Sequence, residues 1–108
     1  MNRQVLSYKM ALGTLASDEP YSEVIREGRL SAGIYAPHDS DDQSTHEEDE
    51  FYVVLNGSGF VNIEGDRQPF GPGDLVFVGA GVSHQFEDFT PDFAVWAIFC
   101  GRSDAPAS

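Results

Sequence analysis

The chain reads HEEDEFYVVLNG from His46 to Gly57, and this stretch decides the fold class of the protein. Residues 51–55 are aromatic, β-branched or aliphatic, which favours a β-strand. The Asn56-Gly57 pair that follows is among the strongest short-range signals for a turn between two strands. We therefore expect a well-defined strand that reverses direction at Gly57.

Similar short segments, separated by glycine and proline, occupy most of the chain. We expect further strands at residues 21–25, 30–36, 60–64, 75–78, 83–86 and 93–99. The best helix candidate is short, residues 4–16, and contains a glycine. Short strands with turn residues between them favour an all-β antiparallel sandwich or barrel. We expect one domain over residues 1–108, with residues 1–20 as an N-terminal extension and residues 101–108 as a flexible tail.

The charge balance excludes several kinds of partner. The 108 residues include 18 acidic and 6 basic side chains, which gives a formal net charge of −12. Phosphate backbones and anionic bilayers repel such a chain, so we expect neither nucleic acid nor membrane as a partner. No apolar run approaches the ~20 residues of a membrane span, and the N-terminus lacks a signal core. Cys100 is the only cysteine, so no internal disulfide can form, and we expect a reducing, cytoplasmic location.

Two of the three histidines stand beside expected strands. Glu50 follows His46 at the fourth position, and His84 opens a later strand after a glycine corner. Imidazole nitrogens and carboxylate oxygens are donors that divalent first-row metals accept. Two histidines and one carboxylate leave coordination positions open. This arrangement suits dioxygen binding at non-haem iron, or Lewis-acid chemistry with zinc, nickel or manganese.

These residues resemble the first sequence motif of the cupin superfamily. In that motif a His-x-His pair is followed by three or four residues, then Glu, then six residues and Gly. Here Ser44, His46, Glu50 and Gly57 take the four positions in order. Ser44 is a poor metal ligand, so Gln43 or His38 is the candidate for an additional one.

The stretch from Gly73 to Asp88 resembles the second cupin motif. Gly79 and Asp88 stand where the motif has proline and asparagine, and His84 is the motif histidine. The resemblance implies a double-stranded β-helix, or jelly-roll barrel, with a pocket at one mouth. It also implies one divalent transition metal per chain (iron, zinc, manganese or nickel) and a homodimer.

Alternation along the strands selects the residues expected to line the pocket. If Glu50 points inward, Tyr52 and Val54 point inward too, and Phe86 shares the direction of the later histidine. Trp96, on the last expected strand, completes the predicted substrate pocket. The Tyr52 hydroxyl is the candidate catalytic group, because it can donate a proton to a substrate oxygen or hold that oxygen.

The segment from Asp39 to Glu50 carries seven carboxylates. Its spacing imitates a calcium-binding loop, but Ser44 stands where the sharp turn needs glycine, and the flanking segments read as strands. We interpret the segment as a solvated acidic loop that concentrates cations near the barrel mouth.

Two functions fit these residues. The first is a metal-dependent enzyme, most simply a dioxygenase-like oxidoreductase, with a Lewis-acid isomerase or lyase as the close variant. The alternative is a non-catalytic module that binds a sugar or a small acid in the pocket. An enzyme needs vacant metal positions, whereas a binding module needs only the pocket.

Overall fold

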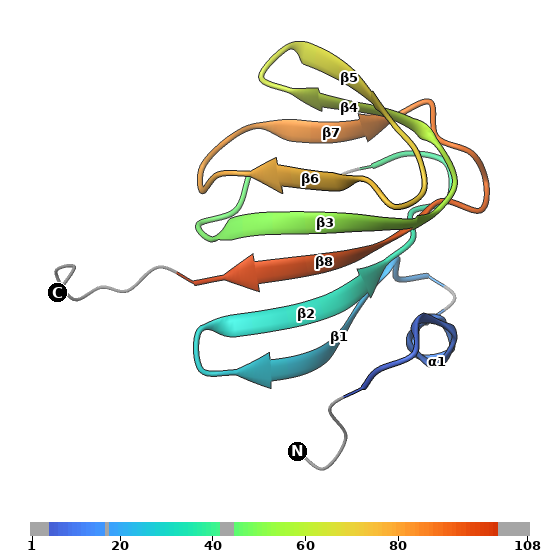
Figure 1. Cartoon of the computed structure of the whole chain (residues 1–108), viewed down its shortest axis with the longest axis vertical. Coiled ribbons are helices and arrows are strands. Elements are labelled where there is room, and N and C mark those ends of the chain that lie inside the picture. Colours follow the sequence, from blue (N-terminus) through green and yellow to red (C-terminus); the bar gives the residue numbers. More distant parts are fainter. Residues whose placement is uncertain (1–4, 17, 42–44, 102–108) are drawn as a thin grey trace, which may run out of the picture.

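Two antiparallel β-sheets face each other across a shared core (Figure 1). The computed structural model describes residues 5–16, 18–41 and 45–101. The larger sheet has the strand order β1-β2-β8-β3-β6, and the smaller has the order β5-β4-β7. The strands are β1 Tyr21–Glu27, β2 Leu30–Tyr35, β3 Asp49–Asn56, β4 Gly59–Ile63, β5 Asp66–Phe70, β6 Leu75–Val78, β7 His84–Glu87 and β8 Ala94–Cys100. This architecture confirms the predicted all-β, double-stranded β-helix fold.

Alternating side chains from both sheets build the core. Tyr52 and Val54 on β3 and Val95 on β8 are buried, and Phe86 on β7 faces them from the smaller sheet. The rings of Tyr52 and Phe86 meet edge-on, with centroids 5.0 Å apart. Burying side chains of this size contributes on the order of 1.5–3 kcal/mol each. The core therefore fixes which side chains of β3 point inward, and Glu50, two residues before Tyr52, is one of them.

The turn after β3 requires glycine for two reasons. Gly57 has a φ of +86°, a left-handed conformation that other residues rarely adopt. A Cβ at this position would lie 2.7 Å from the Cα of Phe93 and 2.6 Å from Oγ1 of Thr90. The glycine predicted to end the strand is thus also needed for the close approach of the segment before β8.

Two local predictions need correction. Strand β5 is absent from the expected strands, because residues 66–69 are polar or proline and show no apolar alternation. Its place at the edge of the smaller sheet tolerates Pro69, which has no backbone N–H. The strand expected at residues 21–25 is longer, because β1 continues to Glu27 and the chain turns at Gly28, which adopts a φ of +60°.

One short helix, α1 (Tyr8–Leu12), forms within the predicted segment 4–16. Ser7 caps it, since its Oγ accepts the backbone N–H groups of Lys9 at 3.1 Å and Met10 at 3.4 Å. Ala11 is buried where α1 packs beside β2. Within the described residues, no helix has the length and apolar character needed to cross a bilayer.

Candidate metal centre

Three side chains meet where β3 and β7 begin: Glu50 lies on β3, His84 lies on β7, and His46 lies just before β3. The Nε2 atom of His46 lies 3.6 Å from Oε1 of Glu50, and Nε2 of His84 lies 3.6 Å from Oε2 of Glu50. Donor atoms that share one metal at about 2.0–2.2 Å lie no more than about 4.4 Å apart, so both distances suit a common ion. Among the described residues, this is the one group of His, Cys, Asp or Glu side chains placed to share a metal. The fold therefore brings together the three residues that the sequence singled out.

The hydrogen bonds around the two imidazoles fit a bound cation. Nδ1 of His84 lies 3.1 Å from the carbonyl oxygen of Val82, which can only accept, so Nδ1 carries the proton and the Nε2 lone pair faces Glu50. Nε2 of His46 is buried and has no hydrogen-bond partner. An unpaired buried polar atom costs about 1–3 kcal/mol, and a metal ion at this point would satisfy it.

The Glu50 carboxyl is only 1% exposed. Burial raises its pKa, and the negative charge of Glu48 acts in the same direction. The hydrogen bond from Tyr52 and the nearby His46 and His84 lower the pKa and offset part of this effect. A buried carboxylate is stabilised by an adjacent positive charge, so a divalent cation suits this position better than an empty polar patch does.

Tyr52 lies against the same trio. Its hydroxyl donates a hydrogen bond to Oε2 of Glu50 and lies 3.0 Å from Nε2 of His84. The hydroxyl has a single proton, so it cannot donate to both acceptors at once. Tyr52 therefore orients the carboxylate and keeps one transferable proton beside the three ligands.

A hollow of about 160 Å³ opens beside His46 and is also lined by Tyr21, Glu23, Arg26, Ser31, Glu48 and Phe99. A β-bulge at Val24 shapes it, because the pairing register of β1 shifts between Glu23 and Ile25. The shift turns Glu23 and Arg26 to the same face, and Nη2 of Arg26 donates to Oε1 of Glu23 at 2.7 Å. The mouth of the site thus has aromatic walls and one ion pair.

The sequence also matches a known family. Residues 33–96 match the model of the family described as the cupin domain. The chain belongs to the cupin family. The uncharacterized protein SCO3923 of Streptomyces coelicolor is 33% identical to it over 86 residues, which cover 78% of this chain and 82% of that protein.

Solved structures share this cupin fold at lower sequence identity. A Klebsiella pneumoniae protein with a double-stranded β-helix domain is 15% identical, with a TM-score of 0.75 over 95% of this chain and 94% of that one. KdgF from a Halomonas species is 24% identical, with a TM-score of 0.69 over 82% of this chain and 86% of that one. These likenesses support the fold and leave the chemistry to the site itself.

Of the two additional ligands expected in this cupin, His38 is wrong, and Gln43 lies outside the described residues, as does Ser44. His38 is exposed and lines a separate hollow near the start of β8. Glu50 pairs with Phe99 near the other end of β8. The length of the barrel therefore separates His38 from the candidate metal centre.

The pocket expected from alternation is wrong for Trp96. Trp96 pairs with Val53, the neighbour of the inward-facing Tyr52, so it lies on the outer face of the larger sheet. Val54 and Phe86 face inward as expected, but they pack within the closed core and do not line the hollow at the metal centre.

Sequence reasoning missed Asp41, which it placed in a solvated loop. Asp41 is 1% exposed, and its carboxylate accepts the backbone N–H of Phe86 at 2.7 Å and the Tyr35 hydroxyl at 2.5 Å. The side chain of Gln85 donates to its backbone carbonyl at 2.9 Å. These bonds tie the loop that leads to His46 onto β7. No local signal distinguishes Asp41 from its acidic neighbours in the sequence.

Proposed function

We propose that this cupin binds one divalent transition metal through His46, Glu50 and His84 and acts there on a small molecule. The observation that carries the proposal is the buried Glu50 carboxylate set between two imidazole Nε2 atoms, one of which has no other partner. A metal held by two histidines and one carboxylate supplies Lewis acidity, or a redox-active centre for dioxygen. The ion is iron, zinc, manganese or nickel.

The chain's own residues divide the remaining work. Glu50 supplies the negative charge, and the carbonyl of Val82 aims the His84 ring. Tyr52 holds a proton on its hydroxyl beside the ligands, and we assign it proton donation to a bound oxygen. The hollow of about 160 Å³ between Tyr21 and Phe99 suits a small ligand, because pockets for drug-sized molecules span about 300–1,000 Å³.

The number of vacant positions favours oxygen chemistry as the first assignment. Three protein ligands leave room for both a chelating substrate oxygen and dioxygen, as in non-haem iron oxygenases. A Lewis-acid isomerase or lyase uses the same ligand set without dioxygen. A non-catalytic sugar- or acid-binding cupin is the second candidate, favoured by the Glu23–Arg26 ion pair, which can contact polar ligands without a metal.

Metal titration tests the ligand set. Metal-depleted protein is loaded separately with ferrous iron, zinc, manganese and nickel, and the bound metal is counted after gel filtration. Wild type should retain about one ion per chain and gain thermal stability, whereas His84→Ala should do neither. His38→Ala is the matched control and should behave as wild type, because His38 is exposed and lines a different hollow. Wild-type protein that retains none of the four metals would contradict the proposal.

Oxygen consumption separates the candidate activities. Iron-loaded protein is assayed with small phenols, diketones and thiols. Uptake by wild type that is absent from His84→Ala supports the dioxygenase assignment. Full iron loading without uptake favours the isomerase or lyase variant. A substrate-induced rise in melting temperature that is equal with and without metal favours the binding module.

A further inference from the structure

The corner between β6 and β7, residues 79–82, contacts both candidate histidine ligands. The backbone N–H of Gly81 donates to the carbonyl oxygen of His46 at 2.7 Å. The carbonyl oxygen of Val82 lies 3.1 Å from Nδ1 of His84. A single short corner therefore carries one hydrogen bond to each histidine, although the two lie far apart in the sequence.

The sequence of the corner does little to fix its shape. Gly79 stands where the second cupin motif has proline, so φ is not locked at this position. Gly81 adopts a φ of +77°, and glycine loses more conformational freedom on folding than any other residue. The N–H of Val82 donates to the carbonyl oxygen of Gly79 at 3.1 Å, which closes the turn without attaching it to the rest of the barrel. Bonds from outside the corner must therefore hold it in place.

Asp49, on β3, supplies such a bond. Its Oδ1 accepts the backbone N–H of Ala80 at 2.9 Å. Hydrogen bonds to an ionised acceptor are roughly twice as strong as those between neutral groups. Because neighbouring side chains on a strand point to opposite faces, Asp49 points away from the candidate metal centre, whereas the adjacent Glu50 points into it. Asp49 thus holds the corner from outside the group of ligands.

We propose that Asp49 is a positioning residue, which fixes the corner against β3 and thereby holds His46 and His84 at the spacing that one metal ion requires. The proposal rests on the proposed metal-binding function. The two histidine Nε2 atoms each lie 3.6 Å from a different oxygen of Glu50. A metal ligand must be held within about 0.5 Å of its productive position, so a larger shift of the corner would separate the ligands.

Two substitutions of Asp49 separate the effect of the hydrogen bond from that of the charge. Asp49→Ala removes both, whereas Asp49→Asn removes the charge and keeps an oxygen that can accept the N–H of Ala80. Zinc affinity is measured by competition with a chromophoric chelator. It should fall about 10–100-fold in Asp49→Ala and stay within about threefold of wild type in Asp49→Asn. An equal loss in the two variants, or wild-type affinity in Asp49→Ala, would overturn the proposal.

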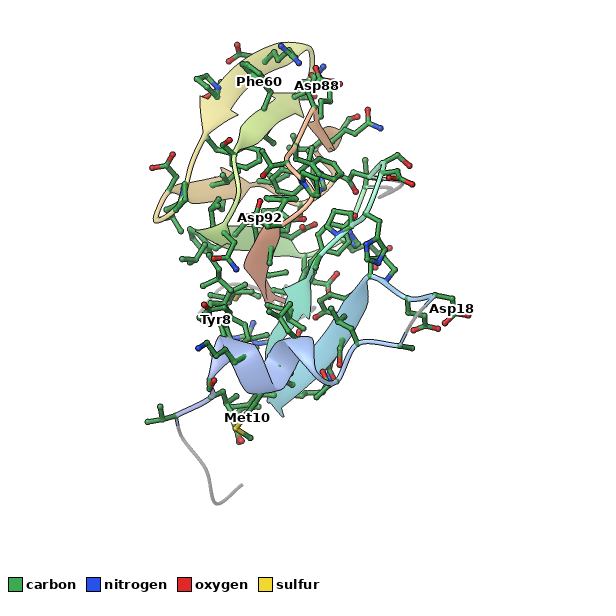
Figure 2. The ribbon with its side chains drawn as sticks, turned by 90° about the vertical axis from the view of Figure 1, so that its right-hand side faces the viewer. Tyr8, Met10, Asp18, Phe60, Asp88 and Asp92 are labelled. Atoms are coloured by element: carbon green, nitrogen blue, oxygen red, sulfur yellow. The ribbon has the colours of Figure 1, made fainter. Side chains whose placement is uncertain are left out.

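Asp74→Ala is the matched control, because it removes the same kind of bond at the other end of β6. Oδ2 of Asp74 accepts the backbone N–H of Gly71 at 2.8 Å, in the turn that directly precedes β6. Figure 1 shows β6 running between this turn and the corner. Figure 2 looks onto the end of the barrel away from the candidate metal centre, where Asp92 lies before β8. The zinc affinity of Asp74→Ala should stay within about threefold of wild type.

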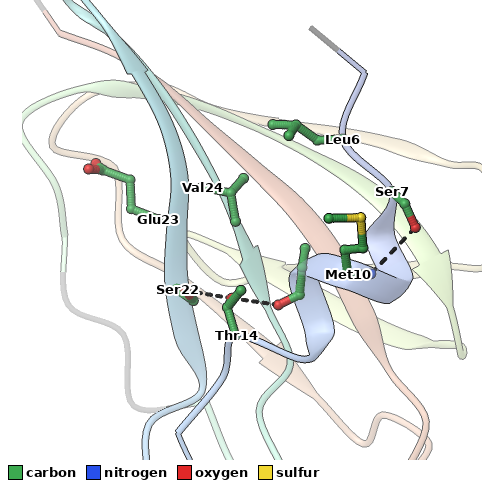
Figure 3. Close-up of a pocket in the computed structure, with 8 residues that line it drawn as sticks. Leu6, Ser7, Met10, Thr14, Ser22, Glu23 and Val24 are labelled. Atoms are coloured by element: carbon green, nitrogen blue, oxygen red, sulfur yellow. Dashed lines mark hydrogen bonds between the residues drawn. The ribbon is translucent and has the colours of Figure 1, made fainter. Parts of the chain in front are cut away.

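Thr14→Ala controls for a general loss of stability. Oγ1 of Thr14 lies 2.6 Å from the carbonyl oxygen of Ala11 and 2.7 Å from Oγ of Ser22, beside a hollow of about 300 Å³ between α1 and β1 (Figure 3). Removing this hydroxyl should lower the melting temperature and leave zinc affinity unchanged, because its bonds join α1 to β1, whereas the corner is bound to β3. If either control loses zinc as strongly as Asp49→Ala does, the proposal is wrong.

Amide hydrogen exchange tests the corner in metal-free protein. In Asp49→Ala the amide hydrogens of Ala80 and Gly81 should exchange at least about tenfold faster than in wild type, while that of Gly71 should be unchanged. In Asp49→Asn all three should exchange at the wild-type rate. Unchanged exchange at Ala80 and Gly81 in Asp49→Ala would overturn the positioning role. A wild type that retains no metal would instead contradict the proposed function, so the two failures are read from different measurements.

Discussion

Replacing Asp41 by asparagine tests whether the loop before β3 is fixed onto β7. Oδ2 of Asp41 accepts the backbone N–H of Phe86 at 2.7 Å, and Oδ1 accepts the Tyr35 hydroxyl at 2.5 Å. Asparagine offers one acceptor oxygen and an NH₂ group in place of the other, so one buried donor loses its partner. An unpaired buried donor costs about 1–3 kcal/mol, and bonds to a charged acceptor are the stronger ones. We expect a loss of about 2–3 kcal/mol in the free energy of unfolding.

Thermal unfolding followed by circular dichroism measures this loss. At about 2.1 cal/mol/K per residue, a chain of 108 residues should melt about 9–13 °C lower. Asp39→Asn is the matched control, because Asp39 is exposed in the same loop and should change stability by no more than about 0.5 kcal/mol. If the two variants melt within about 2 °C of each other, Asp41 is solvated and our account of the loop is wrong.

A double-mutant cycle with Tyr35→Phe isolates one of the two bonds. Once the Tyr35 hydroxyl is absent, asparagine at position 41 can still accept the N–H of Phe86. The cost of Asp41→Asn should therefore shrink by about 0.5–3 kcal/mol in the Tyr35→Phe background. Strictly additive losses would show that the hydroxyl and the carboxylate do not interact.

Three further changes probe the metal centre and the bulged strand. Glu50→Gln should abolish metal binding yet stabilise the metal-free protein, because burial raises the pKa of Glu50 and disfavours its ionised form. With chelator present, the free energy of unfolding is measured against pH for wild type and for this variant. The wild-type value relative to the variant should fall as the pH rises through about 4.3, the pKa of glutamate in the unfolded chain, and should level off above the raised pKa of the folded state. Parallel curves for the two proteins would contradict this. Tyr52→Phe removes the hydrogen bond to Glu50 and should weaken metal affinity about 10–100-fold in competition titrations, so unchanged affinity would exclude an orienting role. Gly33→Ala places a Cβ 2.5 Å from the backbone carbonyl oxygen of Ser22 and should cost about 1–3 kcal/mol, whereas Gly71→Ala, with nothing within 4 Å, should melt close to wild type; equal melting of the two would refute the crowding argument.

How well each strand could be predicted depends on whether its sequence shows which of its two faces is buried. Strand β3 was predictable because its composition favours a strand and the motif carboxylate Glu50 marks its inner face. Strand β8 reads apolar at every position from Ala94 to Phe99, so alternation carries no information about which side chains face inward. Trp96 was assigned to the wrong face for that reason. The polar strand β5 gives no apolar signal at all, because its place at the edge of the smaller sheet does not require one.

The candidate metal centre also has parts that the sequence predicts and parts that it does not. His46, Glu50 and His84 could be predicted because their spacing within two short segments is local information. The burial of Asp41 depends on a hydrogen bond to Phe86, 45 positions away, which no local pattern encodes. The bulge at Val24 also has no local marker, yet it decides which charged side chains line the mouth.

The absence of apolar alternation in β8 has a physical reason. A strand that is apolar on both faces belongs to a sheet that must be covered on both faces, because water is a poor partner for either. The smaller sheet covers the inner face, and helix α1 packs beside the neighbouring β2. On the neighbouring β3, Glu50 points inward to the candidate metal centre and the adjacent Phe51 points outward. A metal ligand must be held within about 0.5 Å of its productive position, and β3, which is paired with β8 on one side and β6 on the other, is well suited to that demand. The apolar strand β8, which obscures the direction of Trp96, thus also supports the strand that carries the candidate ligand Glu50.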